Sequence, residues 1–343
     1  MKPRRVTLRH IAAHVGVHPS TVSRVLNPER RGLVSREVVE RVDQAVRQLG
    51  YYPNRAANGL RTNRSSTIGI VVSDVSHPFF PKLIAGIQDV MIENGYSCVV
   101  CSSDQRPERK RRIIEVIRKH QFDGLILLAT ERVDPLVVAC RQDRIPVAVL
   151  ERGAAPPSAP AVHLDDRSGV RQVMDHLVAL GHTRIAVVSG PQRFSGAFSR
   201  HRLVVAEMTK RALTIDPALI ATCETYSTSE GARRCDAFLA SGSRFTAVVT
   251  ANDLLAIGCA ESLKRHGIAC PGAVSVVGYN DIGLGDKTAP PLTTVRFDQD
   301  ELGSALAGML LRQLREEDAV IPYRQVEPTL VIRGSTAPAP AAS

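Results

Sequence analysis

The sequence contains no tryptophan, and aromatic residues make up only 4% of its 343 residues. No apolar run approaches the ~18 uninterrupted residues that a membrane span needs, so we expect no membrane partner. Hydrophobic residues still account for 44% of the chain, and this composition excludes disordered and collagen-like proteins. The length exceeds the needs of one compact domain and predicts a small domain joined to a larger, two-lobed body.

A disulfide framework is also missing. The seven cysteines are scattered, mostly within apolar runs, and this pattern favours reduced thiols in the cytoplasm. Cys98 and Cys101 lie three positions apart in a run that reads as a strand, so their side chains point to opposite faces and cannot share a metal ion. We therefore predict no metal site. The basic first residues lead into no apolar segment, so we expect no secretion signal.

Sequence signatures of enzymes are absent as well. No GxGxxG follows the first predicted strand, and the chain has no P-loop and no GxSxG motif. The adjacent carboxylates Asp165 and Asp166, and those of 316–318, fit surface or helix-capping positions better than an acid/base pair. We predict that the protein is not an enzyme and needs no cofactor.

What the sequence does have is a strongly uneven charge. Residues 1–64 contain 13 Lys and Arg against 4 Asp and Glu, whereas the remaining 279 residues are nearly balanced at 31 against 30. A basic segment attached to a neutral body indicates a polyanionic partner, either nucleic acid or an anionic membrane surface. A disordered basic tail is the alternative.

Three short helices are predicted within the first fifty residues. Thr7 can cap a helix that Gly16 ends, Pro19 suits the first turn of a second helix, and a longer helix runs from Ser35 to Gly50. Two helices joined by a tight glycine turn indicate a helix-turn-helix. The polar face of the second helix can reach base edges in a major groove. Without the basic charge, a solvated face of a three-helix bundle would be the better explanation, and the charge reverses that preference.

Residues 7–27, ThrLeuArgHisIleAlaAlaHisValGlyValHisProSerThrValSerArgValLeuAsn, resemble the DNA-binding headpiece of the lactose-repressor (LacI/GalR) family of bacterial transcription regulators. The resemblance continues through 49–61 and on to about residue 333. It implies base reading by Pro19, Ser20 and Arg24. The headpiece residues that we expect at the DNA are Thr7, His18, Pro19, Ser20, Thr21, Ser23, Arg24 and Asn27.

Two residues depart from the family pattern. His10 stands where the family often has Asp, and His18 stands where it usually has the serine that caps the recognition helix. Loss of that hydroxyl cap is expected to cost about 1 kcal/mol of stability.

Residues 55–61 form a predicted hinge helix that Asn54 can cap. A helix this short is marginal alone in water, so we expect it to form only when docked. In the family the hinge pairs with its copy in the partner chain, and a leucine inserts into the minor groove. Leu60 matches that leucine. The other hinge residues expected at DNA are Asn54, Arg55, Ala57 and Arg61; an ordinary polar linker is the alternative.

Beyond residue 65, short apolar runs alternate with amphipathic helical stretches, which predicts parallel, doubly wound α/β sheets. The resemblance implies a two-lobed core like that of periplasmic sugar-binding proteins. The predicted division of the chain is a headpiece at 1–52, a hinge and linker at 53–65, an effector-binding and dimerisation core at 66–335 and a disordered tail at 336–343. Within the core we predict a first lobe of about 66–164 and 294–325 and a second of about 165–293 and 326–335.

Ligands of such sheets bind beyond the carboxyl ends of the strands. Side chains just after predicted strands are therefore candidates for an effector site: Asp74, Phe79, Phe80, Glu151, Asn252, Asp253, Asn280 and Asp281, together with Arg202 in the following helical segment. Any of them can instead be a core or turn residue. The resemblance favours Arg202, Asn252 and Asn280.

Asn280 stands where many family members have Asp. An amide there removes a negative charge near Arg202, which favours a sugar acid over a neutral sugar.

Taken together, the sequence predicts a homodimeric, cytoplasmic, sequence-specific DNA-binding repressor. Its small sugar or sugar-acid effector would bind between the core lobes and control its affinity for a pseudo-palindromic operator. Two other classes share parts of this pattern. A solute-binding transport component would have a similar core but no basic headpiece, and a sugar-modifying enzyme would show turnover.

Overall fold

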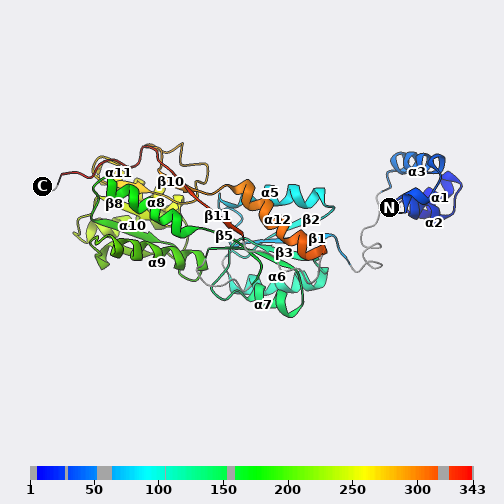
Figure 1. Cartoon of the computed structure of the whole chain (residues 1–343), viewed down its shortest axis with the longest axis horizontal. Coiled ribbons are helices and arrows are strands. Elements are labelled where there is room, and N and C mark those ends of the chain that lie inside the picture. The colour runs from blue at the N-terminus through cyan, green and yellow to red at the C-terminus, as the bar shows by residue number, and fades with distance from the viewer. Residues whose placement is uncertain are drawn as a thin grey trace. The chain divides into compact units, whose positions relative to one another are not determined.

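The computed structural model describes residues 6–27, 30–51, 64–104, 106–152, 159–315 and 324–341 (Figure 1). The chain divides into two compact units, Met1–Asn63 and Arg64–Ser343. Within the described ranges, no helix is long and apolar enough to cross a membrane. The predicted hinge residues Asn54, Arg55, Ala57, Leu60 and Arg61 lie outside the described residues.

The first unit is a small helical headpiece. Its elements are α1 (Leu8–Val15), α2 (Pro19–Val25), the short 3-10 helix η1 (Arg31–Leu33) and α3 (Arg36–Leu49). Gly16 and Gly50 end α1 and α3 with positive φ angles of 74° and 60°, as their sequence positions predict. A shared core of mostly aliphatic side chains holds the helices together: Ile11, Ala12, Val15, Val22, Val25, Val42, Ala45 and Tyr51.

The second unit contains two lobes built on separate parallel sheets. The first lobe has the strand order β11-β5-β4-β3-β1-β2. Its strands are β1 (Thr67–Val72), β2 (Ser97–Ser102), β3 (Gly124–Leu127), β4 (Val147–Glu151), β5 (Ala161–Leu164) and β11 (Arg324–Val326). Its helices are α5 (Phe80–Glu93), α6 (Pro107–His120), α7 (Pro135–Gln142) and α12 (Gln299–Arg315).

The sheet of the second lobe has the order β7-β6-β8-β9. Its strands are β6 (Ile185–Ser189), β7 (Ile220–Thr222), β8 (Ala247–Thr250) and β9 (Ser275–Val277). Its helices are α8 (Asp166–Ala179), α9 (Ser195–Lys210), α10 (Thr228–Ala240) and α11 (Asp253–Arg265), with the 3-10 helix η2 (Pro217–Leu219). Near the junction of the lobes, β10 (Thr294–Arg296) pairs antiparallel with β12 (Thr329–Val331).

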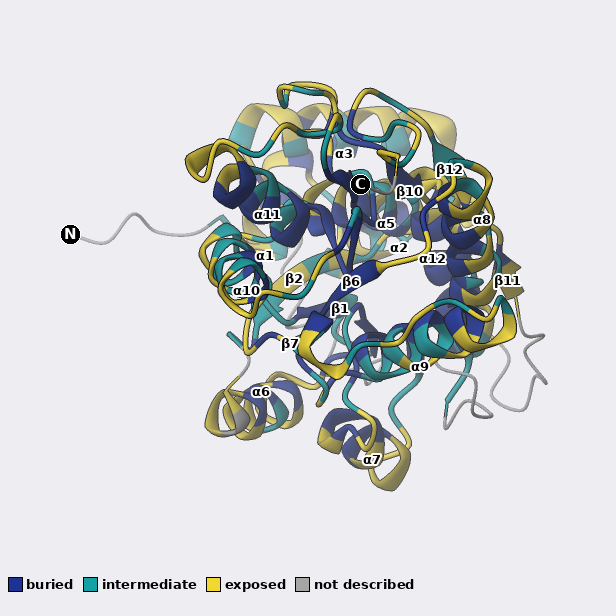
Figure 2. Ribbon diagram, turned by 90° about the vertical axis from the view of Figure 1, so that its left-hand side faces the viewer, coloured by how far each residue is buried: buried dark blue, intermediate teal, exposed yellow. Residues whose placement is uncertain are grey.

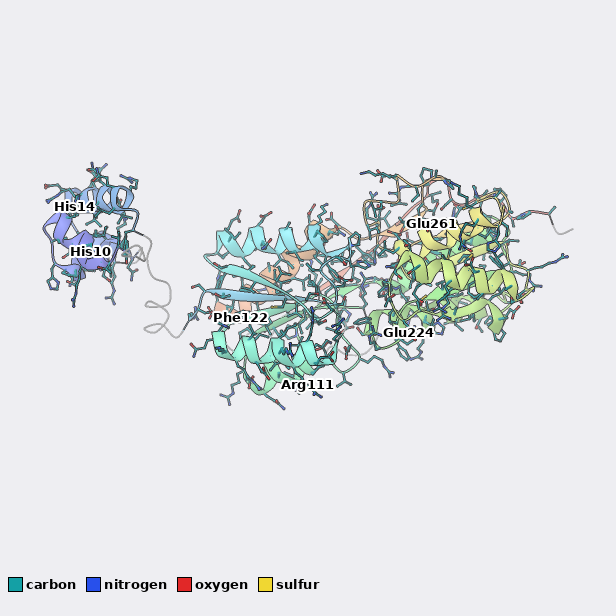
Figure 3. All side chains as sticks on the ribbon, turned by 180° about the vertical axis from the view of Figure 1, so that it is seen from behind. His10, His14, Arg111, Phe122, Glu224 and Glu261 are labelled. Carbon is teal, nitrogen blue, oxygen red and sulfur yellow. The ribbon has the colours of Figure 1, made fainter. Side chains whose placement is uncertain are left out.

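The central strands are buried because helices cover both faces of each sheet, as in β3, where all four residues are buried. The helices turn one buried side inward and an exposed side outward (Figure 2). Charged side chains such as Arg111 of α6 and Glu261 of α11 lie on these exposed sides (Figure 3). The predicted fold class, a helical headpiece with a two-lobed core of parallel doubly wound sheets, is confirmed.

The chain crosses between the lobes near Asp165, after β10 and after β11. Isolated bridges join Thr293 to Val277 and Arg296 to Asn280, so β10 continues along the second lobe and the return crossing comes slightly later than residue 294. At the start of the core, Ser65 and Ser66 already donate backbone hydrogen bonds to the Asp123 carboxylate at 2.7 and 2.9 Å. The predicted linker therefore ends earlier than residue 65.

The C-terminal segment corrects the sequence prediction of a disordered tail. Within the described residues 336–341, Thr336 contacts His176 Nε2 at 2.9 Å, and the Ala337 amide donates to Ser275 Oγ at 3.1 Å. The Ala339 amide also donates to the Leu180 carbonyl at 2.7 Å. The small, proline-containing composition suggested disorder, but buried polar side chains of the second lobe supply hydrogen-bond partners that composition cannot show.

Candidate functional site

The first candidate site is the exposed face of α2. Val22 and Val25 are buried in the headpiece core, whereas Ser20, Ser23 and Arg24 are exposed on the other side of the helix. The spacing of three and four residues places these polar side chains on one face. The face that the sequence predicts for base reading is therefore open to a partner.

The two histidines that depart from the family pattern both act as helix caps. His18 is the N-cap of α2, and its Nδ1 accepts a hydrogen bond from the Ser20 amide at 3.2 Å. His10 lies in the first turn of α1, and its Nδ1 accepts from the Thr7 amide at 3.2 Å. The expected loss of a cap at position 18 is therefore wrong, because the imidazole nitrogen replaces the serine oxygen as the acceptor.

Two headpiece arginines have internal roles. Arg41 donates through Nη2 to the Val15 carbonyl at the end of α1, at 2.5 Å. Arg31 donates to the Val25 carbonyl at 3.3 Å and forms a two-point ion pair with Asp43. Cations at helix C-termini are stabilising, so these guanidiniums hold the helices in place. The basic charge of the headpiece thus overstates the number of side chains free to contact a polyanion.

The second candidate site is a cleft between the two core lobes, with a volume of about 580 Å³ that includes its opening to solvent. Its polar lining comes from segments that follow strands in both lobes, including the N-cap of α11, and from the first two turns of α9. The lining residues are Ser73, His77, Phe79, Phe80, Leu128, Ala129, Thr130, Leu150, Arg152, Phe194, Ser195, Gly196, Ala197, Arg200, Tyr226, Asn252 and Asn280.

Hydrogen bonds join the lobes across this cleft. Thr130 Oγ1 and Ser195 Oγ lie 3.1 Å apart, and the Ser195 amide donates to the Thr130 carbonyl at 3.1 Å. Asn252 caps α11 through its Oδ1, and its Nδ2 lies 3.0 Å from His77 Nε2. Burial lowers the pKa of His77 to about 4, so the ring is neutral at physiological pH.

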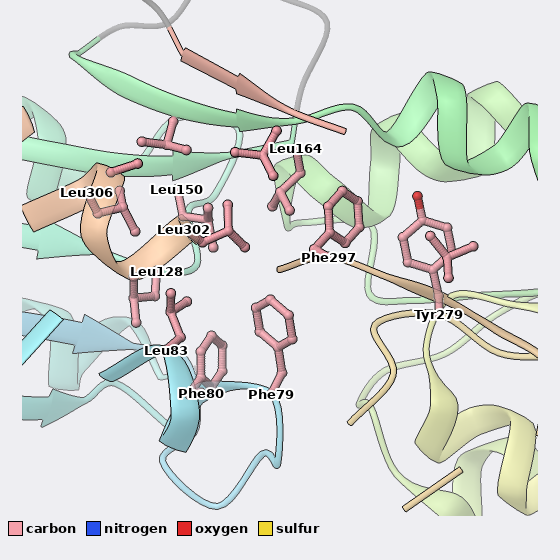
Figure 4. Close-up of a cluster of buried hydrophobic side chains, with 14 of the residues drawn as sticks. Phe79, Phe80, Leu83, Leu128, Leu150, Leu164, Tyr279, Phe297, Leu302 and Leu306 are labelled. Carbon is pink, nitrogen blue, oxygen red and sulfur yellow. The ribbon is translucent and has the colours of Figure 1, made fainter. Parts of the chain in front are cut away.

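Two guanidiniums face the cleft. Arg152 lies between aromatic rings, 5.2 Å from the centroid of Phe79 and 5.4 Å from that of Phe297. Figure 4 shows Phe79 and Phe297 beside the leucine cluster of the first lobe, with Tyr279 further toward the second lobe. Arg200 lies 4.5 Å from the centroid of Tyr279. Such stacking holds a guanidinium in place while leaving its N–H groups available to other partners.

Asp166 lies near both guanidiniums, at the start of α8. Its Oδ1 is 3.5 Å from Arg152 Nη1 and 3.8 Å from Arg200 Nη1, and it accepts a hydrogen bond from the Tyr279 hydroxyl at 2.9 Å. Asp165 caps α8, as the sequence suggested for a capping residue, but Asp166 is buried and is not a surface residue.

Four of the predicted effector residues line the cleft: Phe79, Phe80, Asn252 and Asn280. Asn280 accepts a hydrogen bond from Arg152 Nη2 at 3.2 Å. Asp74 does not line the cleft and instead accepts hydrogen bonds from Ser76. Glu151 is likewise outside the lining, with its Oε1 accepting from the Arg152 amide at 2.9 Å.

The placement of Arg202 in the cleft is wrong. Arg202 is exposed on α9, and the guanidinium that enters the cleft from this helix belongs to Arg200. Residues two positions apart in an α-helix are separated by about 200° around the helix axis. The side chains of Arg200 and Arg202 therefore face nearly opposite ways. The SerArgHisArg sequence offered both candidates, and only the orientation of the helix distinguishes them.

Two further carboxylates that follow strands have structural roles. Asp253 is fully buried and accepts hydrogen bonds from the Thr294 hydroxyl at 2.5 Å and the Ile282 amide at 2.9 Å. Asp281 pairs with Arg333 at 2.9 Å and with Arg296 at 2.6 Å. Both stabilise loops of the second lobe.

Sequence reasoning missed Arg152, Arg200, His77 and Tyr226. Arg152 directly follows β4. The search for polar side chains just after predicted strands, which selected Glu151, could therefore have found Arg152 one position later. Arg200 lies in the same SerArgHisArg sequence as Arg202, whereas His77 and Tyr226 lie in a loop and a turn that carry no comparable signal. Within the described residues, no group of His, Cys, Asp or Glu has an arrangement that could hold a metal ion.

A helix-turn-helix headpiece attached to a two-lobed core with an interlobe cleft defines a ligand-responsive DNA-binding regulator. Residues 7–54 match the model for bacterial regulatory proteins of the lacI family, and residues 174–336 match a periplasmic binding protein-like domain. The chain is 30% identical over 330 residues to the ribose operon repressor of Escherichia coli strain K12, covering 96% of this chain and 99% of that protein. The chain belongs to the lacI family and is a transcription regulator.

Other relatives support the same conclusion. The transcriptional repressor PurR of Haemophilus influenzae strain PittEE is 29% identical over 335 residues, covering 96% of this chain and 98% of that protein. The Lac repressor dimer bound to operator and the anti-inducer ONPF superposes with a TM-score of 0.86 at 27% identity, covering 97% of this chain and all of that one. A complex of the regulator CelR with cellobiose gives a TM-score of 0.73 at 28% identity, with 96% and 100% coverage. These family members are transcriptional regulators and not enzymes.

Proposed function

We propose that this protein is a repressor that binds a pseudo-palindromic operator as a homodimer and changes its operator affinity when a small sugar or sugar acid binds between its core lobes. The observation that carries the proposal is the combination of an exposed polar face on α2 with a cleft whose walls come from both lobes. A ligand in that cleft contacts both lobes and can favour one arrangement over another. We place the protein in the cytoplasm, where bacterial DNA lies.

DNA recognition is assigned to the headpiece and hinge residues that the family pattern selects. Arg24 would read a base edge, and His18, Pro19, Ser20, Thr21, Ser23, Asn27 and Thr7 would contact the bases or the phosphates around it. The hinge residues Asn54, Arg55, Ala57, Leu60 and Arg61 would act at the centre of the operator, with Leu60 inserted in the minor groove.

Dimerisation is supported by exposed apolar side chains at the edge of the first lobe. Strand β2 is at the edge of its sheet, and the side chains of Val99 and Val100 are exposed. An edge strand with exposed valines is prone to association and is usually covered. The solved Lac repressor relative is a dimer.

The proposal is tested by selecting binding sites from random duplex DNA with the full-length protein. We expect a two-fold symmetric consensus, bound with a preference over random competitor DNA. Absence of any sequence preference, with and without candidate sugars, would overturn the proposal.

The Arg24→Ala variant should lose about 1 to 3 kcal/mol of binding free energy on the selected site and relax the preference at one base position in each half-site. Arg202→Ala, which removes an exposed arginine from the core, is the matched control and should bind the selected site like the wild type. Equal binding by the wild type and Arg24→Ala would remove Arg24 from the reading face.

A further inference from the structure

The cleft is lined by two buried guanidinium groups, and burying a charged group costs free energy because it loses its hydration. The side chains of Arg152 and Arg200 are only 12% and 6% exposed, and both line the cleft. Among the described residues, Asp166, whose side chain is 2% exposed, is the carboxylate within ion-pair distance of both guanidiniums, and it does not line the cleft. One carboxylate set behind two guanidiniums leaves the wall of the cleft cationic.

The hydrogen-bond partners of Arg200 are also incomplete. Among the residues that the structure describes, its buried Nε and Nη1 have no hydrogen-bond partner, and the 3.8 Å separation from Asp166 is an ion pair without a hydrogen bond. A buried guanidinium N–H without a partner loses its hydration and gains nothing in return. Burial, together with the like charge of Arg200, lowers the pKa of Arg152. A negatively charged partner in the cleft would relieve both effects.

Other ionisable groups in the cleft do not neutralise the pair. His77 is neutral near pH 7, since burial lowers its pKa to about 4. Burial likewise raises the pKa of Tyr226, which keeps its hydroxyl protonated. Asn280 is an uncharged amide, and its Oδ1 already accepts a hydrogen bond from Arg152.

The rest of the lining suits a hydroxylated molecule. Asn252, Ser195 and Thr130 offer amide and hydroxyl groups, whereas Phe79 and Phe80 offer an apolar surface for a sugar ring. Guanidiniums are the side chains best suited to bind carboxylate or phosphate oxygens.

We propose that the effector is a sugar-sized oxyanion, a sugar acid or a sugar phosphate, whose charged group binds Arg200 and Arg152 while its hydroxyls contact the amides and hydroxyls of both lobes. The inference rests on the proposed function, because it specifies the ligand of the same cleft. Arg200 replaces the sequence-predicted Arg202 as the anion-binding side chain.

The test is calorimetry on the full-length dimer with gluconate, glucuronate, glucose 6-phosphate and glucose at equal ionic strength and pH. Charge-assisted hydrogen bonds predict that at least one of the anions binds about tenfold to a hundredfold tighter than glucose. Binding of the two carboxylates but not the phosphate identifies a sugar acid, and the reverse identifies a sugar phosphate. Equal or tighter binding of glucose, or no binding of any anion, overturns the proposal.

Two arginine variants locate the charged group. Arg200→Gln should abolish the advantage of the anion over glucose, whereas Arg202→Gln, two residues along the same helix and exposed, should keep it. A cooperative unfolding transition and normal binding to the selected operator without ligand show that Arg200→Gln is folded. An advantage that survives in Arg200→Gln overturns the role of Arg200.

Failure of this proposal is distinguishable from failure of the proposed function. A protein that selects a symmetric operator but binds only neutral sugars refutes the anion and keeps the regulator. A protein that binds anions but prefers no DNA sequence refutes the operator function.

Discussion

At the scale of single residues, two histidines act as helix caps, and one of two nearby arginines lines the cleft. His18 and His10 accept backbone hydrogen bonds at the starts of α2 and α1, where oxygen acceptors are more common. Arg200 rather than Arg202 enters the cleft. In each case the decisive feature is the direction of one side chain, which neighbouring residues do not reveal.

The cap at His18 predicts a measurable loss of stability. His18→Ala should lower the free energy of unfolding of the headpiece by about 1 kcal/mol, because the Ser20 amide loses its acceptor. His18→Ser should restore most of the loss. Urea unfolding followed by helical circular dichroism measures both, and identical stability of the alanine and serine variants would show that the imidazole contributes no cap.

The buried imidazole of His77 predicts a dependence of stability on pH. Its pKa of about 4 lies below the ordinary value of 6.5, so between these values the unfolded chain binds a proton that the folded chain does not. Stability therefore falls as pH drops from about 6.5 to about 4 and changes little on this account below that range. Burial is the main cause, with Arg152 and Arg200 acting in the same direction and Asp74 opposing them.

His77→Gln lacks this titration but keeps an amide that can contact Asn252. From pH 7 to pH 5, the wild type should lose about 2 kcal/mol more than the variant, at 1.36 kcal/mol per pH unit below 6.5. Urea unfolding of the core at the two pH values gives both quantities. An equal loss in the two proteins would show that His77 stays solvated.

At the scale of elements, close helix packing depends on particular glycines. A Cβ at Gly258 of α11 would overlap the Thr228 carbonyl oxygen and approach the Ala232 amide of α10 at 2.7 Å. On α12, by contrast, a Cβ at Gly308 would meet nothing within 4 Å. The two glycines look alike in sequence, since both lie inside amphipathic helices.

The opposite effects of alanine at these positions are a test of the packing. Gly258→Ala should destabilise the core by about 3 kcal/mol or more, because backbone atoms must move apart. Gly308→Ala should stabilise it by about 0.5 to 1 kcal/mol through higher helix propensity. Thermal unfolding of the two variants against the wild type measures the contrast; two changes of the same sign would contradict the α10–α11 contact.

At the scale of the whole molecule, function depends on coupling between two separate units. The lobes are joined across the cleft by the Thr130–Ser195 and His77–Asn252 hydrogen bonds, and under the proposed function a ligand seated there would change the balance between lobe arrangements. A ligand alters operator affinity only as far as its affinity differs between those arrangements.

This coupling predicts reciprocity. The factor by which a saturating effector changes operator affinity must equal the factor by which saturating operator changes effector affinity, and typical couplings are about 5- to 150-fold. Fluorescence anisotropy of labelled operator and calorimetry of the effector measure the two factors. Operator affinity that is unchanged by a ligand bound in the cleft would show that the cleft is not regulatory.

The sequence alone determined the elements and the class of the protein. The apolar runs that become β1, β3, β4, β6 and β8 are short and continuous, and the glycines at 16 and 50 end helices, because both signals act over a few residues. The segregated positive charge and the α2 motif pointed to DNA for the same reason.

Only the tertiary structure decided which charges meet. Arg152 follows a strand, Asp166 begins α8 and Arg200 lies in the second turn of α9, and they become neighbours only when the two lobes are assembled. The segment 336–341 is ordered by side chains more than 60 residues away, such as Ser275. Contacts between distant segments depend on how whole helices and strands are oriented. Local periodicity and composition do not determine that orientation.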